Sequence, residues 1–392
     1  MWPWLEIDMV SEVQKKPTYA EFFSGGGMVR AALSDGWDCR LANDIDPMKC
    51  DVYVRNWGDD GLVQADVGQL DPDLLRQPID LYWASSPCQD FSLAGKGLGL
   101  AGSRSGTFST WATLIEHAIQ DGYAPRVIAF ENVVGLIARN RGADFAAVIR
   151  RLAKLGYRVG ALEIDATAFL PQSRSRLFVV CLRDDLLIKG LTTPQPTGPF
   201  HTKKLMSFVA SAPRDIARNW IWWKHAPVVF DPKPLVQMID HAPDTAWLTA
   251  HETKRLLSMM SPPSLSRIEA AKRTGHPEIG MLYKRGRPDG DGGSHQRAEV
   301  RFDGIAGCLR TPGGGSSRQT VLFVEGDKIR ARLLSSREAA RLMGLEDSYV
   351  MPARYNNAYK VAGDGVVVPV VRYLDQQIFQ PALQLARLRD VA

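Results

Sequence analysis

Apolar runs of strand length alternate with helical patterns in the first part of the chain. The run from Thr18 to Phe23 breaks into the glycine-rich segment Ser24 to Gly27, and a helical pattern follows from Met28 to Leu33. A second apolar run, from Asp38 to Ala42, ends at an acidic stretch, residues 43–46. Strands that alternate with helical segments are typical of a parallel sheet. The pattern therefore predicts a doubly wound, Rossmann-like α/β domain.

Residues with reactive side chains follow the ends of two further apolar runs. The run from Ile79 to Ala84 leads to Pro87 and Cys88, and the run from Val127 to Phe130 leads to Glu131. In a doubly wound sheet the carboxyl ends of the strands line one crevice, where ligands bind. We therefore expect the thiol, the carboxyl group and the glycine turn to lie together.

The glycine turn predicts a site for a nucleotide-type cofactor. Glycines 25–27 allow the backbone to approach a ligand closely, and the start of the next helix offers free N–H groups. Asp44 lies about 20 residues beyond the glycines, where an acid can bind ribose hydroxyls. Asp66 supplies a second acid before a turn, although alone it could equally be only a turn or cap residue.

The amino-acid composition of the chain changes after Arg183. Residues 192–199 contain three prolines and a glycine, which is typical of a linker. The cluster from Asn219 to Lys224 contains three tryptophans, for which we favour packing over a base-stacking surface. We interpret the segment from Lys284 to Arg297 as a loop, and its charge and glycines favour a DNA-facing loop over a solvated turn.

Two apolar segments follow near the end of the chain. Residues 335–343 are predicted to form a helix with Ser336 as its cap and Arg341 in its last turns. The stretch from Val361 to Leu374 surrounds Gly363-Asp364-Gly365 and is expected to return to the first domain.

Composition narrows the class of protein. A chain of 392 residues with 45% hydrophobic residues can form two domains. Five widely spaced cysteines without a CxxC pair argue against a disulfide framework, and neither the cysteines nor the histidines have the spacing of a metal site. The net charge is +5, and residues 190–300 carry the whole excess, with 15 Lys and Arg against 10 Asp and Glu. A polyanion would therefore meet mainly this middle segment.

The first sixteen residues contain acids and no long apolar core. We therefore expect neither a signal peptide nor a membrane span, and a reducing cytoplasm is the expected compartment.

A thiol, a carboxyl group and a pair of guanidinium groups suit nucleophilic attack on cytosine, an electron-rich ring. Cys88 can act as the nucleophile at C6 and Glu131 as the acid that neutralises charge at N3, while Arg174 and Arg176 can hold the O2 edge and a phosphate. These residues recur with further motifs in a fixed order: Phe23-Ser24-Gly25-Gly26-Gly27, Asn43-Asp44-Ile45-Asp46, Ala65-Asp66-Val67, Pro87-Cys88-Gln89, Ser103 to Phe108, Glu131-Asn132-Val133, Gln172 to Arg176, and Gly304-Ile305-Ala306 with Gly313-Gly314-Gly315.

With these motifs the chain resembles the DNA cytosine-5 methyltransferases over nearly all of its length outside residues 200–280. The resemblance implies methyl transfer from S-adenosylmethionine to C5 of a cytosine that has left duplex DNA. It implies a catalytic and cofactor-binding domain at residues 1–190 plus 353–392, and a smaller target-recognition domain with a hinge at residues 191–352. The loop at residues 90–102 is suited to closing over the base.

The resemblance also assigns individual residues. Arg176 is expected at O2 and Arg174 at a phosphate near the flipped base. The residues expected to bind the cofactor are Phe23, Ser24, Gly25, Gly26, Gly27, Asp44, Ile45, Asp66, Val67, Pro87, Asp364 and Val366.

The chain departs from the family pattern at two places. Met28 stands where the first motif usually has another glycine, and Gly363-Asp364-Gly365 replaces the usual Gly-Asn-Ser of the last motif. An amide that donates and accepts thus becomes a carboxylate that only accepts. Either Asp364 binds the ammonium group of the cofactor, which we favour, or the pocket takes a different donor.

The partner expected is double-stranded DNA, with a monomeric enzyme near the nucleoid of a prokaryote. Whether the enzyme accompanies a cognate restriction endonuclease or acts alone stays open. Three alternatives remain at this point: a tRNA cytosine-5 methyltransferase, although the Cys-Phe-Thr signature of that branch is absent; a non-catalytic DNA-binding relative; and transfer of a group other than methyl.

Overall fold

The computed structural model describes residues 15–34, 36–86, 106–228, 234–240, 242–288, 294–311 and 318–391. The expected nucleophile Cys88 lies outside them, as do Pro87, the loop at residues 90–102 and the glycines at 313–315.

A seven-stranded sheet forms the larger part of the molecule, with the strand order β3-β2-β1-β4-β5-β7-β6. The paired strands are parallel except for β7, which runs antiparallel to both β5 and β6. Its strands are β1 (Thr18–Phe22), β2 (Asp38–Asp44), β3 (Leu62–Gln64), β4 (Leu81–Ala84), β5 (Val127–Val133), β6 (Tyr157–Asp165) and β7 (Ser175–Arg183). The order changes direction between β1 and β4, so the doubly wound α/β prediction is confirmed.

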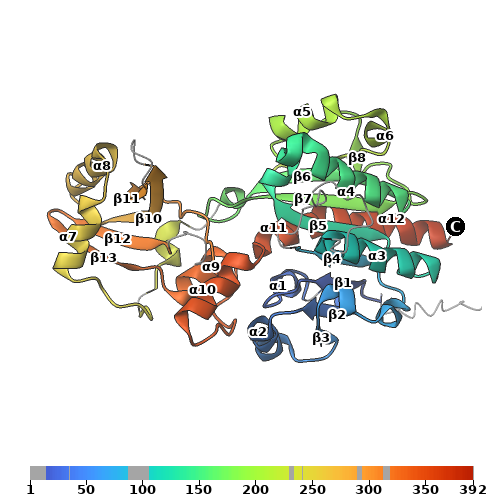
Figure 1. The fold of residues 1–392 in the computed structure, drawn as a ribbon, viewed down its shortest axis with the longest axis horizontal. Helices are drawn as coiled ribbons and strands as arrows, with labels where there is room; N and C mark the ends of the chain where they lie inside the picture. Colours follow the sequence, from blue (N-terminus) through green and yellow to red (C-terminus); the bar gives the residue numbers. More distant parts are fainter. Residues whose placement is uncertain are drawn as a thin grey trace, which may run out of the picture.

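Helices cover both faces of this sheet (Figure 1). Tyr19, Leu81 and Trp83 pack on the face covered by α1, α2, α11 and α12, whereas Ala20, Phe22 and Tyr82 pack on the opposite face, against α3 and α4. Because both faces are buried, the strands appear in the sequence as continuous apolar runs. The helices are α1 (Met28–Leu33), α2 (Pro47–Trp57), α3 (Thr107–Gln120), α4 (Ala143–Lys154), α11 (Val368–Leu374) and α12 (Gln380–Val391).

Short turns join several of these elements. The 3-10 turns are η1 (Val67–Gln69), η2 (Pro72–Leu75), η4 (Val134–Ile137), η5 (Arg139–Gly142), η6 (Ala166–Ala168) and η7 (Leu235–Met238), and η8 (Asp375–Phe379) is a π-helical segment before α12.

The segment that follows β7 packs on the large sheet. β8 (Thr192–Thr193) pairs with β9 (Trp222–Trp223). In the sequence, α5 (Lys203–Ser211) and α6 (Arg214–Ala217) lie between these two strands. Trp223 is 0% exposed and donates its indole N–H to the Val180 carbonyl. The packing interpretation of the tryptophans is confirmed, whereas the linker prediction for residues 192–199 is wrong, because apolar side chains on both sides of the prolines anchor this segment to the core.

A second, four-stranded antiparallel sheet has its own core (Figure 1). Its order is β11-β10-β12-β13, and α7 and α8 pack on one face. The expected loop from Lys284 to Arg297 is instead a hairpin, because Lys284 pairs with Ala298 and Arg285 with Arg297. The elements are α7 (Ala250–Ser258), α8 (Pro262–Lys272), β10 (Glu278–Pro288), β11 (Ser294–Arg301), β12 (Thr320–Glu325) and β13 (Lys328–Leu333).

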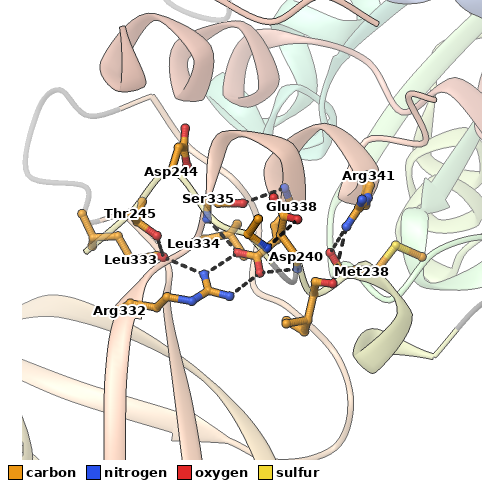
Figure 2. Close-up of polar contacts among 12 residues, drawn as sticks. Met238, Asp240, Asp244, Thr245, Arg332, Leu333, Leu334, Ser335, Glu338 and Arg341 are labelled. Atoms are coloured by element: carbon orange, nitrogen blue, oxygen red, sulfur yellow. Dashed lines mark hydrogen bonds and ion pairs between the residues drawn. The ribbon is translucent and has the colours of Figure 1, made fainter. Parts of the chain in front are cut away.

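A buried polar network joins the second sheet to the helices that return to the large sheet (Figure 2). The Arg332 guanidinium on β13 forms two bonds with Glu338 on α9 (Ser336–Leu342), at 2.6 and 2.8 Å. The same carboxylate accepts a bond from the Ser335 amide, while the Ser335 hydroxyl accepts one from the Glu338 amide. Ser335, not the expected Ser336, is therefore the helix cap.

From α9 the chain continues through α10 (Tyr355–Asp364) into α11, which packs against α1. The expected return of residues 361–374 to the first domain is thus confirmed. No helix in the described ranges is long and apolar enough to span a membrane.

Candidate active site

The carboxyl ends of β1, β4 and β5 lie next to one another in the large sheet. The glycine turn follows β1, Ser86 follows β4, and Glu131 lies near the end of β5. The Asn132 side-chain amide donates to the Ser86 carbonyl at 3.1 Å. This bond holds the chain two residues before Cys88 against the residue that follows Glu131, so the segments that carry the expected nucleophile and acid are tied together.

Glu131 forms an ion pair with Arg176 on the neighbouring strand. The Arg176 Nε lies 3.1 Å from the Glu131 Oε1. Phe178 stands opposite Glu131 in the register, so Arg176, two residues away on β7, has its side chain on the same face. The sequence prediction that these two residues act together is consistent with this geometry.

Burial decides the protonation behaviour of Glu131. The residue is only 9% exposed, and this burial raises the pKa of its carboxyl group, while Arg176 and then Arg174 act in the opposite direction. The net direction is upward. A carboxyl group with a raised pKa retains a proton more readily, which suits a group that must donate to a ring nitrogen.

Arg174 is not available for the phosphate contact that we expected. It is 3% exposed, and its guanidinium donates to the carbonyls of Leu309, Gly363 and Gly365 at 2.7 to 2.9 Å. These bonds join the start of β7 to the hinge segment and to the last cofactor motif. Arg174 is therefore a positioning residue in this structure, because both of its terminal nitrogens donate inside the protein and its Nε is buried without a partner among the described residues.

Other residues of the same motif reinforce this junction. The Gln172 side chain donates to the Leu342 carbonyl and accepts from the Leu309 amide, and the Ala306 backbone pairs with Pro171 and Ser173. No sequence motif pointed to Cys308, whose thiol lies 3.5 Å from the Arg174 guanidinium. Burial would raise the pKa of this thiol, but the neighbouring arginines lower it.

The glycine turn has an unusual backbone. Phe23, Gly25 and Gly27 have φ values of 59°, 56° and 79°. The left-handed conformation of Phe23 costs energy for a non-glycine residue, and such strain clusters at functional sites. The Gly25 amide donates to the Asp44 carboxylate at 2.8 Å, which fixes the turn on the end of β2.

The three glycines serve different purposes. A Cβ atom at Gly26 would lie 2.3 Å from the Tyr349 hydroxyl, and one at Gly27 would lie 2.4 Å from the Trp57 indole nitrogen, so these two glycines permit close packing. At Gly25 the nearest atom would be the Lys49 Cδ, 4.0 Å away. Gly25 therefore marks the open side of the turn.

The expected cofactor residues divide into accessible and buried groups. Ile45 is 61% exposed and Asp66 is also exposed, while Val67 and Val366 are buried in the core. Asp66 accepts a bond from the Gly68 amide, as a cap does, and its carboxylate has further acceptor capacity. Asp44 accepts bonds from two backbone amides, those of Gly25 and Asp46.

Asp364 has partners that the sequence did not predict. Its carboxylate forms an ion pair with Lys49 on α2, at 2.9 Å, and accepts a bond from the Thr311 hydroxyl. No motif signalled Lys49; the available hint was a lysine in the first turn of the helix that follows the acidic stretch. Lys49 and Asp364 thus place a positive and a negative group beside the glycine turn.

The two departures from the family pattern meet in space. A Cβ atom at Gly365 would lie 2.1 Å from the Met28 sulfur. Met28 is buried, so its side chain has little room to move away. Glycine in place of serine at 365 therefore accommodates methionine in place of glycine at 28.

The doubly wound sheet, the glycine turn at its switch point and the buried acid beside an arginine define an enzyme of the Rossmann-like methyltransferase class. The family model of the C-5 cytosine-specific DNA methylases matches residues 18–380. The chain belongs to this family, whose members transfer methyl from S-adenosylmethionine to C5 of cytosine in DNA.

Individual members of the family are similar in sequence to this chain over most of its length. It is 27% identical over 362 residues to the type II methyltransferase M.HhaI of Haemophilus parahaemolyticus, covering 92% of this chain and 93% of the relative. It is 26% identical over 386 residues to M.HpaII of Haemophilus parainfluenzae, covering 94% and 90%. The crystal structure of the S. pombe Dnmt2 methyltransferase shares the fold, with a TM-score of 0.57, 19% identity and coverage of 93% and 99%.

The residues at the switch point fit S-adenosylmethionine. The Ser24 hydroxyl is buried and has no hydrogen-bond partner among the described residues, which leaves a polar atom for a ligand. The exposed Ile45 offers an apolar surface for an adenine, and the acids near the ends of β2 and β3 can accept bonds from hydroxyl and amino groups. In the described ranges, no group of three His, Cys, Asp or Glu could hold a metal ion.

Proposed function

We propose that this enzyme methylates cytosine in a specific duplex DNA sequence through a covalent bond between Cys88 and C6 of a flipped-out base. The observation that carries the proposal is the buried Glu131–Arg176 pair beside the strand end that leads to Cys88. A buried acid with a raised pKa and a guanidinium fork together match the N3 and O2 edge of cytosine.

The reaction begins with attack of the Cys88 thiolate on C6. The C6–Sγ bond forms as the C5–C6 π electrons move to C5, while Glu131 donates a hydrogen bond and a proton to N3 and Arg176 holds O2. S-adenosylmethionine, when bound at the glycine turn, would supply an electrophilic methyl group from its sulfonium and leave as S-adenosylhomocysteine. C5 gains the methyl group, loses its proton to a base, and the returning electrons expel Cys88 while the N3 proton returns to Glu131.

The target base must leave the double helix, because neither C5 nor C6 is accessible in a stacked base pair. Glu131, near the carboxyl end of β5, and Arg176, at the start of β7, are largely buried, so a base that stays in the helix cannot reach them. The energy of unstacking, a few kcal/mol, must come from contacts between the protein and the DNA.

We propose that the four-stranded sheet reads the DNA sequence, as part of a target-recognition domain at residues 191–352 opposite a catalytic domain at 1–190 plus 353–392. Residues 191–223 pack on the large sheet, so the recognition function would belong mainly to β10–β13 and their helices. A cleft of about 830 Å³ between α8 and β11 has Arg267, Arg297 and Arg301 in its lining. Arginine suits both phosphate contacts and guanine recognition.

Bisulfite sequencing of DNA from cells that express the chain tests the reaction. We expect protected cytosines in one sequence context with the wild type and with Cys39→Ala, a thiol control on β2, but none with Cys88→Ala. Protected cytosines that persist in Cys88→Ala would exclude the thiol mechanism. No protected cytosines with the wild type would favour an RNA substrate or a silent relative, and labelled methyl transfer to tRNA would separate these two.

A duplex that carries 5-fluorocytosine in the identified sequence tests the covalent step. Fluorine at C5 blocks proton loss, so the Cys88 adduct should survive denaturing electrophoresis with the wild type. Recovery of only free protein and free duplex would contradict the adduct.

We further propose that the enzyme acts as a monomer on chromosomal DNA in a prokaryotic cytoplasm and protects the sites of a cognate restriction endonuclease. One flipped base presents a single asymmetric target, and the relatives above are named type II methyltransferases. Light scattering of the free enzyme and of its complex with a duplex would measure the oligomeric state. Two enzyme copies per target would contradict a monomer.

A further inference from the structure

Lys49 and Asp364 form an ion pair beside the open side of the glycine turn. The Lys49 Nζ lies 2.9 Å from the Asp364 Oδ2, and the Lys49 Cδ is the atom nearest to a Cβ built at Gly25. The two residues come from α2 and from the end of α10, more than 300 positions apart in the sequence. The pair therefore adds a positive and a negative group next to the same backbone.

Both members are held in place by further contacts. Asp364 accepts a bond from the Thr311 hydroxyl, and Arg174 holds the carbonyls of the residues on either side, Gly363 and Gly365. The Lys49 side chain is 17% exposed and that of Asp364 is 33% exposed, so each remains partly accessible. A rigid but accessible pair of charges is suited to a ligand that carries both signs.

Each member also retains capacity for another contact. An ammonium group has three donors and a carboxylate has about four acceptor positions. Contact with Asp364 raises the pKa of Lys49 although burial acts against it, so the lysine stays charged. Lys49 can therefore donate to a second carboxylate while Asp364 accepts from a second ammonium group.

We propose that Lys49 and Asp364 bind the zwitterionic amino-acid end of the cofactor, with Lys49 on its carboxylate and Asp364 on its ammonium group. The inference rests on the proposed use of the glycine turn for S-adenosylmethionine, and it assigns the specificity for the amino-acid end to this pair. It replaces the simpler expectation that Asp364 alone meets the ammonium group, because the acid is already paired with a lysine that a ligand carboxylate can use.

Isothermal titration calorimetry without DNA tests this inference. The ligands are S-adenosylhomocysteine, which has the amino-acid end, and 5′-methylthioadenosine, which lacks it. We expect Lys49→Met and Asp364→Asn each to weaken S-adenosylhomocysteine binding at least about tenfold, or about 1.4 kcal/mol. The affinity for 5′-methylthioadenosine should stay within about twofold of the wild type, since neither side chain contacts that ligand.

Arg55→Met is the matched control, because it removes an exposed ion pair with Asp51 on the same helix. It should leave both affinities unchanged. Equal losses for the two ligands in the Lys49 and Asp364 variants would indicate a merely structural pair, and unchanged S-adenosylhomocysteine binding would also overturn the inference. A wild type that binds no S-adenosylhomocysteine would instead refute the cofactor site itself, whereas bisulfite protection that fails despite intact binding would refute only the proposed reaction.

Discussion

The pKa of Glu131 depends on its burial and on two nearby guanidinium groups. Arg176 orients the carboxyl group through its Nε, and the more deeply buried Arg174 contributes at longer range. Burial outweighs both charges, so the pKa is raised, although an exposed pair of the same residues would have it lowered. The residue thus owes its acid character to its position at the end of β5 and not to the Glu-Asn-Val motif alone.

Glu131→Gln should lower kcat by at least about 100-fold, because glutamine cannot donate a proton to N3. S-adenosylhomocysteine binding should stay unchanged, since the substitution preserves size and leaves the glycine turn intact. Labelled methyl transfer and calorimetry measure the two quantities. A kcat within fivefold of the wild type would exclude the acid role.

Glu21 is a second buried acid, in the middle of β1. Burial is the main cause that raises its pKa to about 8, and its Oε2 has no hydrogen-bond partner among the described residues. Between its usual value of 4.5 and about 8, the folded protein holds a proton that the unfolded chain releases. The contribution of Glu21 is therefore favourable at low pH and is lost as the pH rises through this window.

Glu21→Gln should flatten this dependence. The free energy of unfolding of the wild type should fall relative to that of the variant by up to about 1.4 kcal/mol per pH unit between pH 5 and 8. Urea denaturation of both proteins at several pH values measures the difference. Parallel profiles would show that Glu21 is ionised in the folded protein.

At the scale of elements, two buried arginines connect segments that are distant in the sequence. Arg174 joins β7 to the hinge and to the last cofactor motif, and Arg332 joins β13 to α9. The Arg332–Glu338 pair is almost completely buried, at 1% and 0% side-chain exposure (Figure 2). A buried pair of this kind contributes little net stability, but the loss of one partner leaves an uncompensated charge.

Glu338→Leu should therefore lower the free energy of unfolding by about 3–5 kcal/mol. The double variant Arg332→Met/Glu338→Leu should lose much less than the sum of the two single variants, because it leaves no unpaired charge. Arg150→Met, which removes the exposed pair with Asp215, should cost less than about 1 kcal/mol. Strictly additive losses in the double-mutant cycle would contradict coupling across this junction.

At the scale of the molecule, the candidate site and the arginine-lined cleft lie on different sheets. The candidate site lies at strand ends of the large sheet, while Arg267, Arg297 and Arg301 line the cleft of the second sheet between α8 and β11. Figure 1 shows the two sheets at opposite ends of the molecule, with α9 and α10 between them. A duplex bound by both parts would bring phosphates to the second sheet and the target base to the first.

Duplex binding should weaken steeply with salt, because each neutralised phosphate contributes a slope of about −0.9 to the plot of log K against log salt concentration. Arg297→Ala, in the cleft on β11, should make this slope shallower by about 1. Arg150→Ala, on α4, is the control and should not change it. Fluorescence anisotropy over a range of salt concentrations measures both, and a flat response of the wild type would contradict phosphate binding.

The sequence by itself determined the doubly wound sheet, the glycine turn and the pairing of Glu131 with Arg176 in one site. Apolar runs, turn glycines and strand ends are local features, and a sheet with that connectivity brings strand ends together. The resemblance of the motifs also led to the family, which the match over residues 18–380 confirms. The role of Cys88 stays a prediction, because that residue lies outside the described ranges.

Only the tertiary structure decided which of these residues remain available. Arg174 donates to carbonyls that lie 135 to 191 positions away, so its sequence motif could not show that it is a positioning residue. Asp364 meets Lys49, and Gly365 meets Met28, across more than 300 positions. Local patterns specify strands, turns and reactive groups, but contacts between distant segments depend on packing, and packing determines which charges are already paired before a ligand arrives.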